Sequence, residues 1–267
     1  MRKAMKKRIA CAAVVAAALF TLSACVSGTE TGDASAWLST LADASVWLSV
    51  LGGVGITLLI AVVSVLVGLS AGAALFILDY YGNRVVRAVM PRVSNLFSLL
   101  PVLTWLVICH YLIFPVGKTG LGAALLGLSV TFTVKVYDTL RSCCEAVPAG
   151  QTDAAVAMGY DKKGTLFRIL LPQILPRFLD AISQCMVLHV QDSTLVGYIA
   201  VNDLQAVTDA IADRTGAPFW PMMITAVLYI GMNLLIRLGV GALRKRFFPN
   251  SLNADQLKRR ALRKETK

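Results

Sequence analysis

The sequence predicts an all-α integral membrane protein with about five core transmembrane helices and an N-terminal signal or anchor. Three observations lead to this fold class. Of the 267 residues, 57% are hydrophobic and only 15% are charged. The mean hydropathy is +0.68, and the apolar residues come in long runs rather than in the alternating patterns of soluble domains. A helix needs about 20 apolar residues to cross a bilayer, so a chain of this length fits one membrane domain.

The first 25 residues have the composition of a secretory signal. Five basic residues precede an apolar stretch from Ile9 to about Leu22, and Leu22-Ser23-Ala24-Cys25 follows. Basic, apolar and small-residue regions in this order are typical of a signal peptide. The ending resembles a bacterial lipobox, which makes Cys25 a candidate for lipidation; an uncleaved signal anchor is the alternative. Residues 26–45 are rich in Ser, Thr, Gly and Asp, which predicts an extracytoplasmic linker.

Five apolar runs follow the linker. The predicted spans cover about 46–78, 93–114, the stretch from the turn at 115–120 to 137, then 178–201 and 219–243. The first span is rich in glycine, a small residue that lets helices approach closely in lipid. The second has Pro101 inside it, which would free a backbone carbonyl within the membrane.

The positive charges determine the predicted orientation. Basic residues concentrate at 79–92, at 138–177 and in the tail 249–267, whereas the segment after the fourth span holds three aspartates and one arginine. Cytoplasmic loops carry an excess of Lys and Arg. The sequence therefore predicts a multi-pass protein of the bacterial plasma membrane, with the mature N-terminus outside and the C-terminus in the cytoplasm. Topology thus accounts for the net charge of +11, and no basic surface interleaved with aromatic residues favours nucleic acid as a partner.

The long polar segment after the third span carries the most specific pattern of the chain. An acidic residue is followed by two alanines, a glycine and an Ile-x-Leu-Pro sequence, at Asp153, Ala154, Ala155, Gly159, Ile169, Leu171 and Pro172. Thr152 is a suitable N-cap, and Asp161 is suited to cap a second helix. Gly159 is suited to end the first helix. The pattern predicts two short helices joined by a sharp turn, the second ending at Pro172.

This segment, residues 148–173, resembles the EAA loop of ABC importer permeases, with Asp153 where the family usually has glutamate. The stretch before it and Gln191-Asp192-Ser193-Thr194-Leu195 after it resemble segments of the polar amino-acid permease family, although Gln191 replaces the usual lysine. The resemblance covers 46–248 and implies the transmembrane domain of a type I importer.

The resemblance also implies partners. ABC ATPase subunits would dock at the loop, an extracytoplasmic solute-binding protein would deliver the solute, and the permease would act as a homo- or heterodimer in the lipid bilayer. The chain has no Gly-rich phosphate loop of the Walker type. We therefore expect that it is not itself an enzyme and binds no cofactor, and that the partner subunit uses the ATP.

The predicted fourth span is unusually polar, with His189, Gln191, Asp192, Ser193 and Thr194 near its end. Charge inside a span is costly and usually faces a cavity or a partner. At helical spacing His189, Asp192 and Ser193 share one face. Two interpretations stay open. These residues line the translocation path and hydrogen-bond a zwitterionic ligand, or they tie the span to another helix or subunit.

These features favour the permease subunit of an ATP-driven ABC importer, with a polar amino acid as the solute. One alternative is an ABC permease for another small solute, such as a quaternary amine, methionine or an oxyanion. Another is an ion-coupled secondary carrier in which His189 and Asp192 relay protons, against which the EAA-like loop argues. A lipid-anchored scaffold, suggested only by Cys25, leaves the glycine-rich spans unexplained. No catalytic or metal-ligand set stands out, because the adjacent Cys143 and Cys144 lack the spacing of a metal site.

Overall fold

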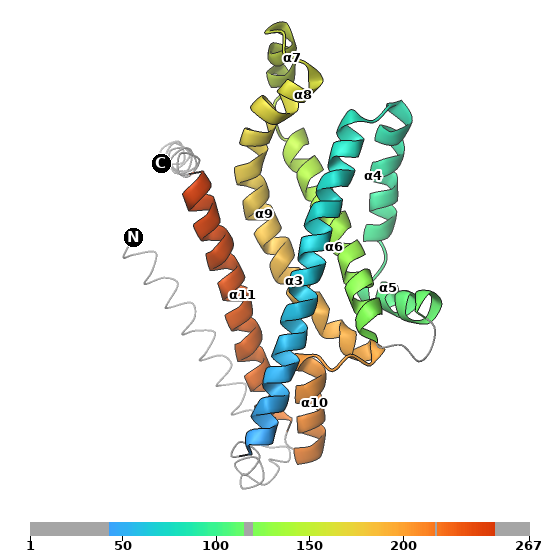
Figure 1. Ribbon diagram of the computed structural model, residues 1–267, viewed down its shortest axis with the longest axis vertical. Helices are drawn as coiled ribbons and strands as arrows, with labels where there is room; N and C mark the ends of the chain where they lie inside the picture. Colours follow the sequence, from blue (N-terminus) through green and yellow to red (C-terminus); the bar gives the residue numbers. More distant parts are fainter. Residues whose placement is uncertain (1–42, 115–119, 217, 249–267) are drawn as a thin grey trace, which may run out of the picture.

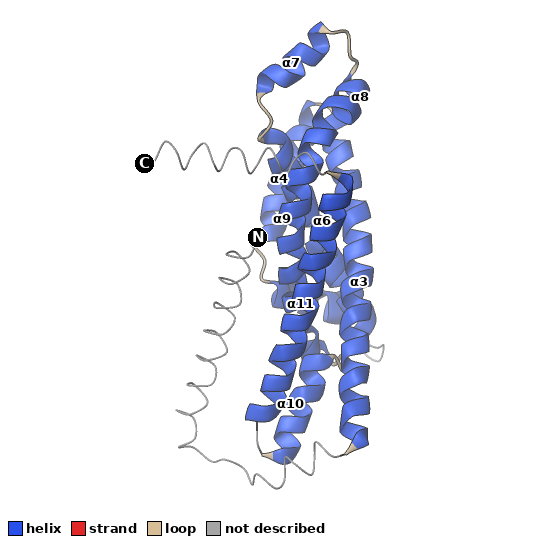
Figure 2. Ribbon diagram, turned by 90° about the vertical axis from the view of Figure 1, so that its left-hand side faces the viewer, coloured by secondary structure: helices blue, strands red, loops and turns tan. Residues whose placement is uncertain are grey.

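The computed structural model describes residues 43–114, 120–216 and 218–248, and within them every regular element is a helix. The helices form one elongated bundle, with α7 and α8 at one end and α10 at the other (Figures 1 and 2). The predicted all-α fold is confirmed. The predicted signal at 1–25 with Cys25, nearly all of the linker at 26–45, and the tail at 249–267 lie outside the described residues.

The first predicted span is one long helix, α3 (Ala44–Tyr81), which packs along much of α6 (Gly120–Glu145). Two glycines of α3 allow this close contact. A Cβ atom at Gly68 would lie 2.7 Å from the Phe132 ring, and one at Gly72 would lie 2.7 Å from the carbonyl oxygen of Thr133. Helices in lipid gain their association energy largely from such close packing. The α3–α6 pair is therefore the centre of the bundle.

The second predicted span, about 93–114 with Pro101 inside it, is broken at that proline. The arginine-rich segment that we expected to be a loop is already helical, and the chain turns by 96° after it. Pro101 lies at the turn because proline lacks the N–H that a helix interior needs and disfavours a helical residue before it. The parts are α4 (Arg84–Ser98), α5 (Val102–Ile108) and the π-helical turn η1 (Cys109–Ile113).

The predicted end of a helix at Pro172 is also wrong. After α7 (Ala149–Ala157), one helical rod continues from the Asp161 cap into the predicted fourth span. The π-helical turn before Pro172 has i→i+5 hydrogen bonds, and Pro172 stands in the first turn of the next segment, where its missing N–H is tolerated. The rod consists of α8 (Lys162–Gly164), η2 (Thr165–Leu170), α9 (Leu171–Asp192) and the 3₁₀ segment η3 (Ser193–Ile199).

The acidic segment that we expected to be an outer loop contains a helix, α10 (Leu204–Thr215). Asp203 caps it by accepting a hydrogen bond from the Ala206 amide at 3.0 Å. Thr57 of α3 accepts another from the Leu204 amide at 3.1 Å, which ties α10 to the bundle. Burial raises the pKa of the Asp203 carboxyl, an effect that the hydrogen bonds from backbone amides oppose. The last helix, α11 (Phe219–Phe247), then runs back along the bundle (Figure 1).

Within the described residues, α3, α6 and α11 are long and apolar enough to cross a membrane, and the bent pair of α4 with α5 and η1 would make a fourth span. The fourth predicted span corresponds to α9, which has the length but not the apolar composition. Its neighbours explain the difference. Because α6 and α11 pack against α9, part of its surface faces protein instead of lipid and tolerates polar side chains.

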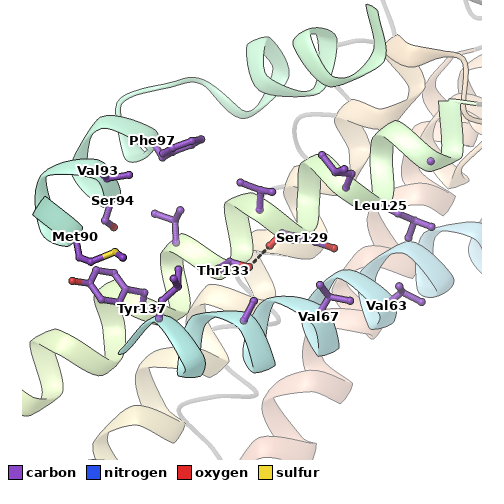
Figure 3. A pocket seen from close by; sticks show the side chains of 16 residues that line it. Val63, Val67, Met90, Val93, Ser94, Phe97, Leu125, Ser129, Thr133 and Tyr137 are labelled. Carbon is purple, nitrogen blue, oxygen red and sulfur yellow. Dashed lines mark hydrogen bonds between the residues drawn. The ribbon is translucent and has the colours of Figure 1, made fainter. Parts of the chain in front are cut away.

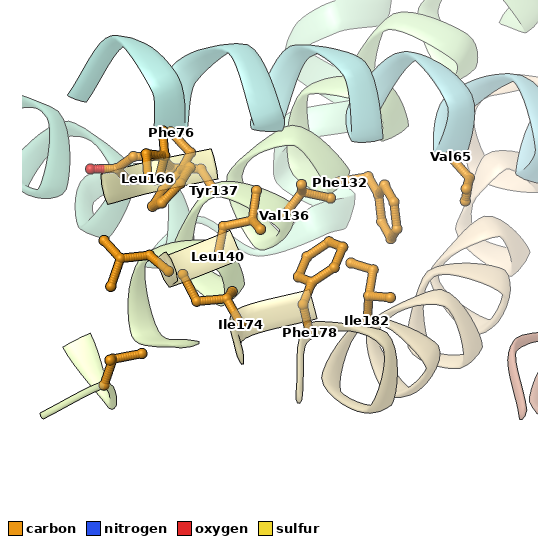
Figure 4. Close-up of a cluster of buried hydrophobic side chains, with 12 residues drawn as sticks. Val65, Phe76, Phe132, Val136, Tyr137, Leu140, Leu166, Ile174, Phe178 and Ile182 are labelled. Carbon is orange, nitrogen blue, oxygen red and sulfur yellow. The ribbon is translucent and has the colours of Figure 1, made fainter. Parts of the chain in front are cut away.

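Two buried clusters fill the bundle. One lies toward the α7 end and joins α3, α6, η2 and α9 through large side chains such as Phe76, Phe132 and Phe178 (Figure 4). The other lies toward the α10 end, where Ile60 and Leu128 pack against Val196 of η3. The rod that continues α8 therefore contributes to both clusters.

Replacing Gly72 with alanine is expected to destabilise the protein by about 1–3 kcal/mol, because the new methyl group overpacks a contact that includes backbone. The matched control is Gly55→Ala on the same helix, where a Cβ atom would meet nothing within 4 Å. Alanine should there be neutral or stabilise by up to about 1 kcal/mol. Thermal unfolding in detergent micelles measures both, and equal effects would show that α3 and α6 do not pack this closely.

Candidate functional site

A salt bridge lies within the bundle, between α6 and α9. Lys135 Nζ donates to Asp192 Oδ2 at 2.6 Å, and the two side chains are 30% and 25% exposed. The pair is therefore mostly withdrawn from solvent, where each charge needs the other. Of the five polar residues predicted for the translocation path, Asp192 is the one that the structure pairs with an opposite charge.

Lys135 was missed by the sequence reasoning, although a signal for it existed. It is the one charged residue between Gly120 and Tyr137 in the predicted third span, and an ionisable residue inside a span is by default a candidate functional residue. Lys135 lines a small cavity of about 120 Å³ at the break between α4 and α5, together with Trp105 and Thr131. The break thus places a cavity beside the salt bridge.

His189 has a different environment from Asp192. Its side chain is fully buried, with Nε2 2.7 Å from Ser64 Oγ of α3 and its ring against Phe132 at 4.6 Å between centroids. The Ser64 hydroxyl also donates to the Ile60 carbonyl at 2.6 Å. His189 Nδ1 has no hydrogen-bond partner among the described residues.

The remaining predicted path residues bond locally. The Ser193 hydroxyl is buried and donates to the Val190 carbonyl at 2.7 Å, while the Thr194 hydroxyl donates to the Gln191 carbonyl at 2.9 Å. Gln191 itself is exposed. His189 and Ser193 thus share a face that is covered by protein, and Asp192 lies at its edge against α6. The role of these residues as path residues stays a prediction.

Polar contacts also join α9 to α11. Arg244 forms a salt bridge with Asp180 at 2.5 Å, and Arg237 donates to the side-chain oxygen of Gln184 at 2.9 Å. With the Lys135 contact on its other side, α9 is held by charged groups to both neighbouring helices. Such contacts prevent α9 from rotating or sliding unless they exchange partners.

The predicted loop of residues 148–173 lies at one end of the molecule (Figures 1 and 2). Its first helix, α7, begins after Pro148, so the prediction that Thr152 is the N-cap is wrong. The proline explains the earlier start, because its φ is preset for a helix boundary. Gly159 ends α7 with φ +84°, and Asp161 caps α8 by accepting from the Gly164 amide at 2.8 Å. Both predictions are confirmed.

The outer surface of this loop is apolar at its tip. Ala155 is buried, while Asp153 and Ala154 face solvent, as do Val156 at 63% exposure and Met158 at 67%. A hollow of about 620 Å³ lies beside them, between the turn at Gly159 and the start of η2. Further along, Ile169 and Leu171 are half-buried, and Pro172 is exposed. Exposed apolar side chains next to a hollow are typical of a protein interface.

No group of three or more possible metal ligands occurs in the described part of the chain. The four cysteines described there, Cys109, Cys143, Cys144 and Cys185, are free thiols. The arrangement offers a salt bridge beside a cavity and an exposed apolar loop, which suit binding and movement.

Comparison with known proteins identifies a family that this chain matches. Residues 64–249 match the family described as binding-protein-dependent transport system inner membrane component. The arginine ABC transporter permease protein ArtQ of Haemophilus influenzae is 29% identical over 72% of this chain and 90% of its own length. The glutamate transport system permease protein GluD of Corynebacterium glutamicum is 31% identical over 66% of this chain and 67% of its own length.

A solved structure shares the fold. The crystal structure of an amino acid ABC transporter with histidines includes a chain that superposes with a TM-score of 0.70 at 21% identity. The match covers 79% of this chain and 98% of that chain. The arrangement of helices described above is thus that of an ABC transporter membrane domain.

Removing one partner of the salt bridge is expected to cost more than removing both. Lys135→Met leaves Asp192 as an unpaired, mostly buried charge, and we expect a loss of about 2–3 kcal/mol, since the pair is partly exposed. The double variant Lys135→Met with Asp192→Leu should recover much of that loss. Thermal unfolding of the purified protein measures both, with Lys245→Met on exposed α11 as the control. Losses that simply add would contradict the pairing.

Proposed function

The chain belongs to the family of binding-protein-dependent transport system inner membrane components, and we propose that it forms the membrane path of an ATP-driven importer for a polar amino acid. It is the permease subunit of an ABC transporter, embedded in the membrane as a bundle of apolar helices. The solute is inferred from relatives that are named for arginine, glutamate and glutamine transport.

The observation that carries the choice of an amino acid is the Lys135–Asp192 pair. An amino acid has a carboxylate and an ammonium group on one carbon atom, and the pair offers a cation and a carboxylate side by side next to a cavity. A zwitterion could exchange partners with these two charges without leaving either one unpaired, which keeps the cost of buried charge low. Of the predicted path residues, we therefore assign Asp192 the central role and add Lys135 to the set.

The coupling role of the loop rests on its position and its exposed surface. Its apolar tip projects from the end of the bundle that we assign to the cytoplasm, where basic residues gather. We assign this tip to docking of separate ATPase subunits, and the opposite end around α10 to contact with an external solute-binding protein. Two permease chains together would enclose the path. The continuous rod from α8 to η3 connects the docking loop with Asp192.

The geometry of His189 supports this proposal over a proton-coupled carrier. A relay would need His189 and Asp192 to exchange a proton, but His189 bonds to Ser64 on α3 whereas Asp192 bonds to Lys135 on α6. Each group is already paired with a different helix.

The decisive test is purification of the chain from its native membrane, followed by uptake in proteoliposomes. We expect an ATPase subunit and a solute-binding protein to copurify, and uptake of arginine, glutamine or glutamate to require ATP. Labelled methionine and a quaternary amine serve as alternative solutes. Uptake that needs only a proton gradient, with no ATPase present, would overturn the proposal.

The turn at Gly159 gives a second test. Because Gly159 has φ +84° and open space around it, Gly159→Ala strains the backbone by about 1–2 kcal/mol without creating a clash. We expect ATP-driven uptake to fall several-fold while membrane insertion stays normal. Gly150→Ala is the matched control, since Gly150 also has open space but lies within α7 at negative φ. Equal uptake by the two variants would remove the coupling role from this turn.

A further inference from the structure

A second cavity, which shares Phe97 and Val134 with the small cavity beside Lys135, opens between α3, α4 and α6 (Figure 3). Its volume is about 660 Å³, and the surface that lines it is mostly apolar. Val67 of α3 and Val93 of α4 are each more than 40% exposed in it, so the groove is open rather than filled by its own side chains. An apolar groove of this size within a membrane bundle is expected to have an apolar occupant.

The third wall of the groove is α4, which runs beside α3 and α6 (Figure 1) before the chain turns by 96° into α5. Two hydroxyl groups fasten α4 to α6. Ser94 donates to Asp138 Oδ1 at 2.5 Å, and Ser98 donates to Asp138 Oδ2 at 3.4 Å. Figure 3 shows Val93, Ser94 and Phe97 on α4 facing Ser129, Thr133 and Tyr137 on α6 across the gap. The groove is thus a built feature, fixed by side-chain hydrogen bonds.

The dimensions of the groove suit a single extended chain. Its α6 residues run from Gly122 to Tyr137, which at 1.5 Å per residue spans about 22 Å. This length is greater than the thickness of one leaflet, which is half of a hydrocarbon core about 30 Å thick. The groove is therefore long enough to hold an acyl chain that reaches through one leaflet.

A positive charge lies at one end of the groove. Arg87 precedes the groove residue Met90 by three positions, so both lie on one face of α4. Arg87 and Arg84 are exposed, and neither forms a salt bridge with a carboxylate among the residues that the structure describes. An exposed guanidinium group at this end of the groove is suited to bind a phosphate oxygen.

We propose that the groove between α3, α4 and α6 binds one acyl chain of an anionic glycerophospholipid whose phosphate lies against Arg87. The apolar wall binds the chain, and the arginine selects an anionic headgroup at the membrane surface. The site is independent of the transported solute. Only the choice of leaflet, the cytoplasmic one, rests on the proposed orientation of the chain.

The test uses the full-length chain in nanodiscs of phosphatidylcholine that contain a small fraction of phosphatidylglycerol with a photoreactive acyl chain. After illumination, mass spectrometry maps the labelled residues. We expect labels at Met90, Val93 and Val134 to exceed those at Leu234 and Leu235 on the exposed face of α11 at least several-fold. The same lipid with a phosphatidylcholine headgroup should label the groove about five-fold less, the effect of one arginine near the surface.

Two pairs of variants test the contributions of the apolar groove and of the Arg87 charge separately. Ala71→Phe fills the groove from α3 and should abolish its labelling, whereas Leu66→Phe, at an exposed position of α3 that does not line the groove, should not. Arg87→Gln should remove the five-fold preference for phosphatidylglycerol without disturbing the fold, whereas Arg246→Gln at the end of α11 should preserve it. Labelling of the groove no stronger than that of α11, or the same preference in Arg87→Gln, would overturn the proposal. So would crosslinks from groove residues to a second copy of the chain.

Discussion

The structure depends on one constraint, which is that backbone amides and carbonyls inside a membrane find their partners within the protein. Helices satisfy this along their length, and irregular backbone is tolerated where protein or a cavity surrounds it. The interruption of the second predicted span at Pro101 follows this rule, because it lies against Trp105 and Lys135 at the small cavity. The change to 3₁₀ geometry after Asp192 follows it too, since Ser193 and Val196 are fully buried there. The irregular segments are therefore where the bundle can hold polar groups.

The same constraint concentrates charge on α9. Asp192 faces Lys135 of α6 on one side, and Asp180 and Gln184 face Arg244 and Arg237 of α11 on the other. A movement of α9 must exchange these partners together, which favours two discrete arrangements over gradual drift. Because α9 continues the rod that starts at the Asp161 cap, a displacement at the docking loop can reach Asp192 along one continuous run of helix. This continuity gives the proposed coupling role of the loop a physical basis.

Neighbouring helices of the bundle meet in two different ways. The α3–α6 contact is so close that glycine is required at Gly68 and Gly72, whereas α4 stands apart and leaves an apolar groove. Close packing excludes lipid from the first contact, and the hydroxyl bonds to Asp138 fix the position of α4 at the second. Lipid in the proposed site would touch Phe97 and Val134, which also line the small cavity beside Lys135.

The sequence by itself determined the features that depend on neighbouring residues. The long apolar runs predicted an all-helical membrane protein, Gly159 predicted a helix end because glycine adopts positive φ at little cost, and Asp161 predicted a cap. Tertiary structure decided the rest. The turn at Pro101, the continuation through Pro172 and the Lys135–Asp192 pair depend on which helices lie side by side. Lys135 and Asp192 are 57 residues apart, so no local pattern joins them. The partner of a buried charge is set by helix packing, and packing is a property of the whole bundle.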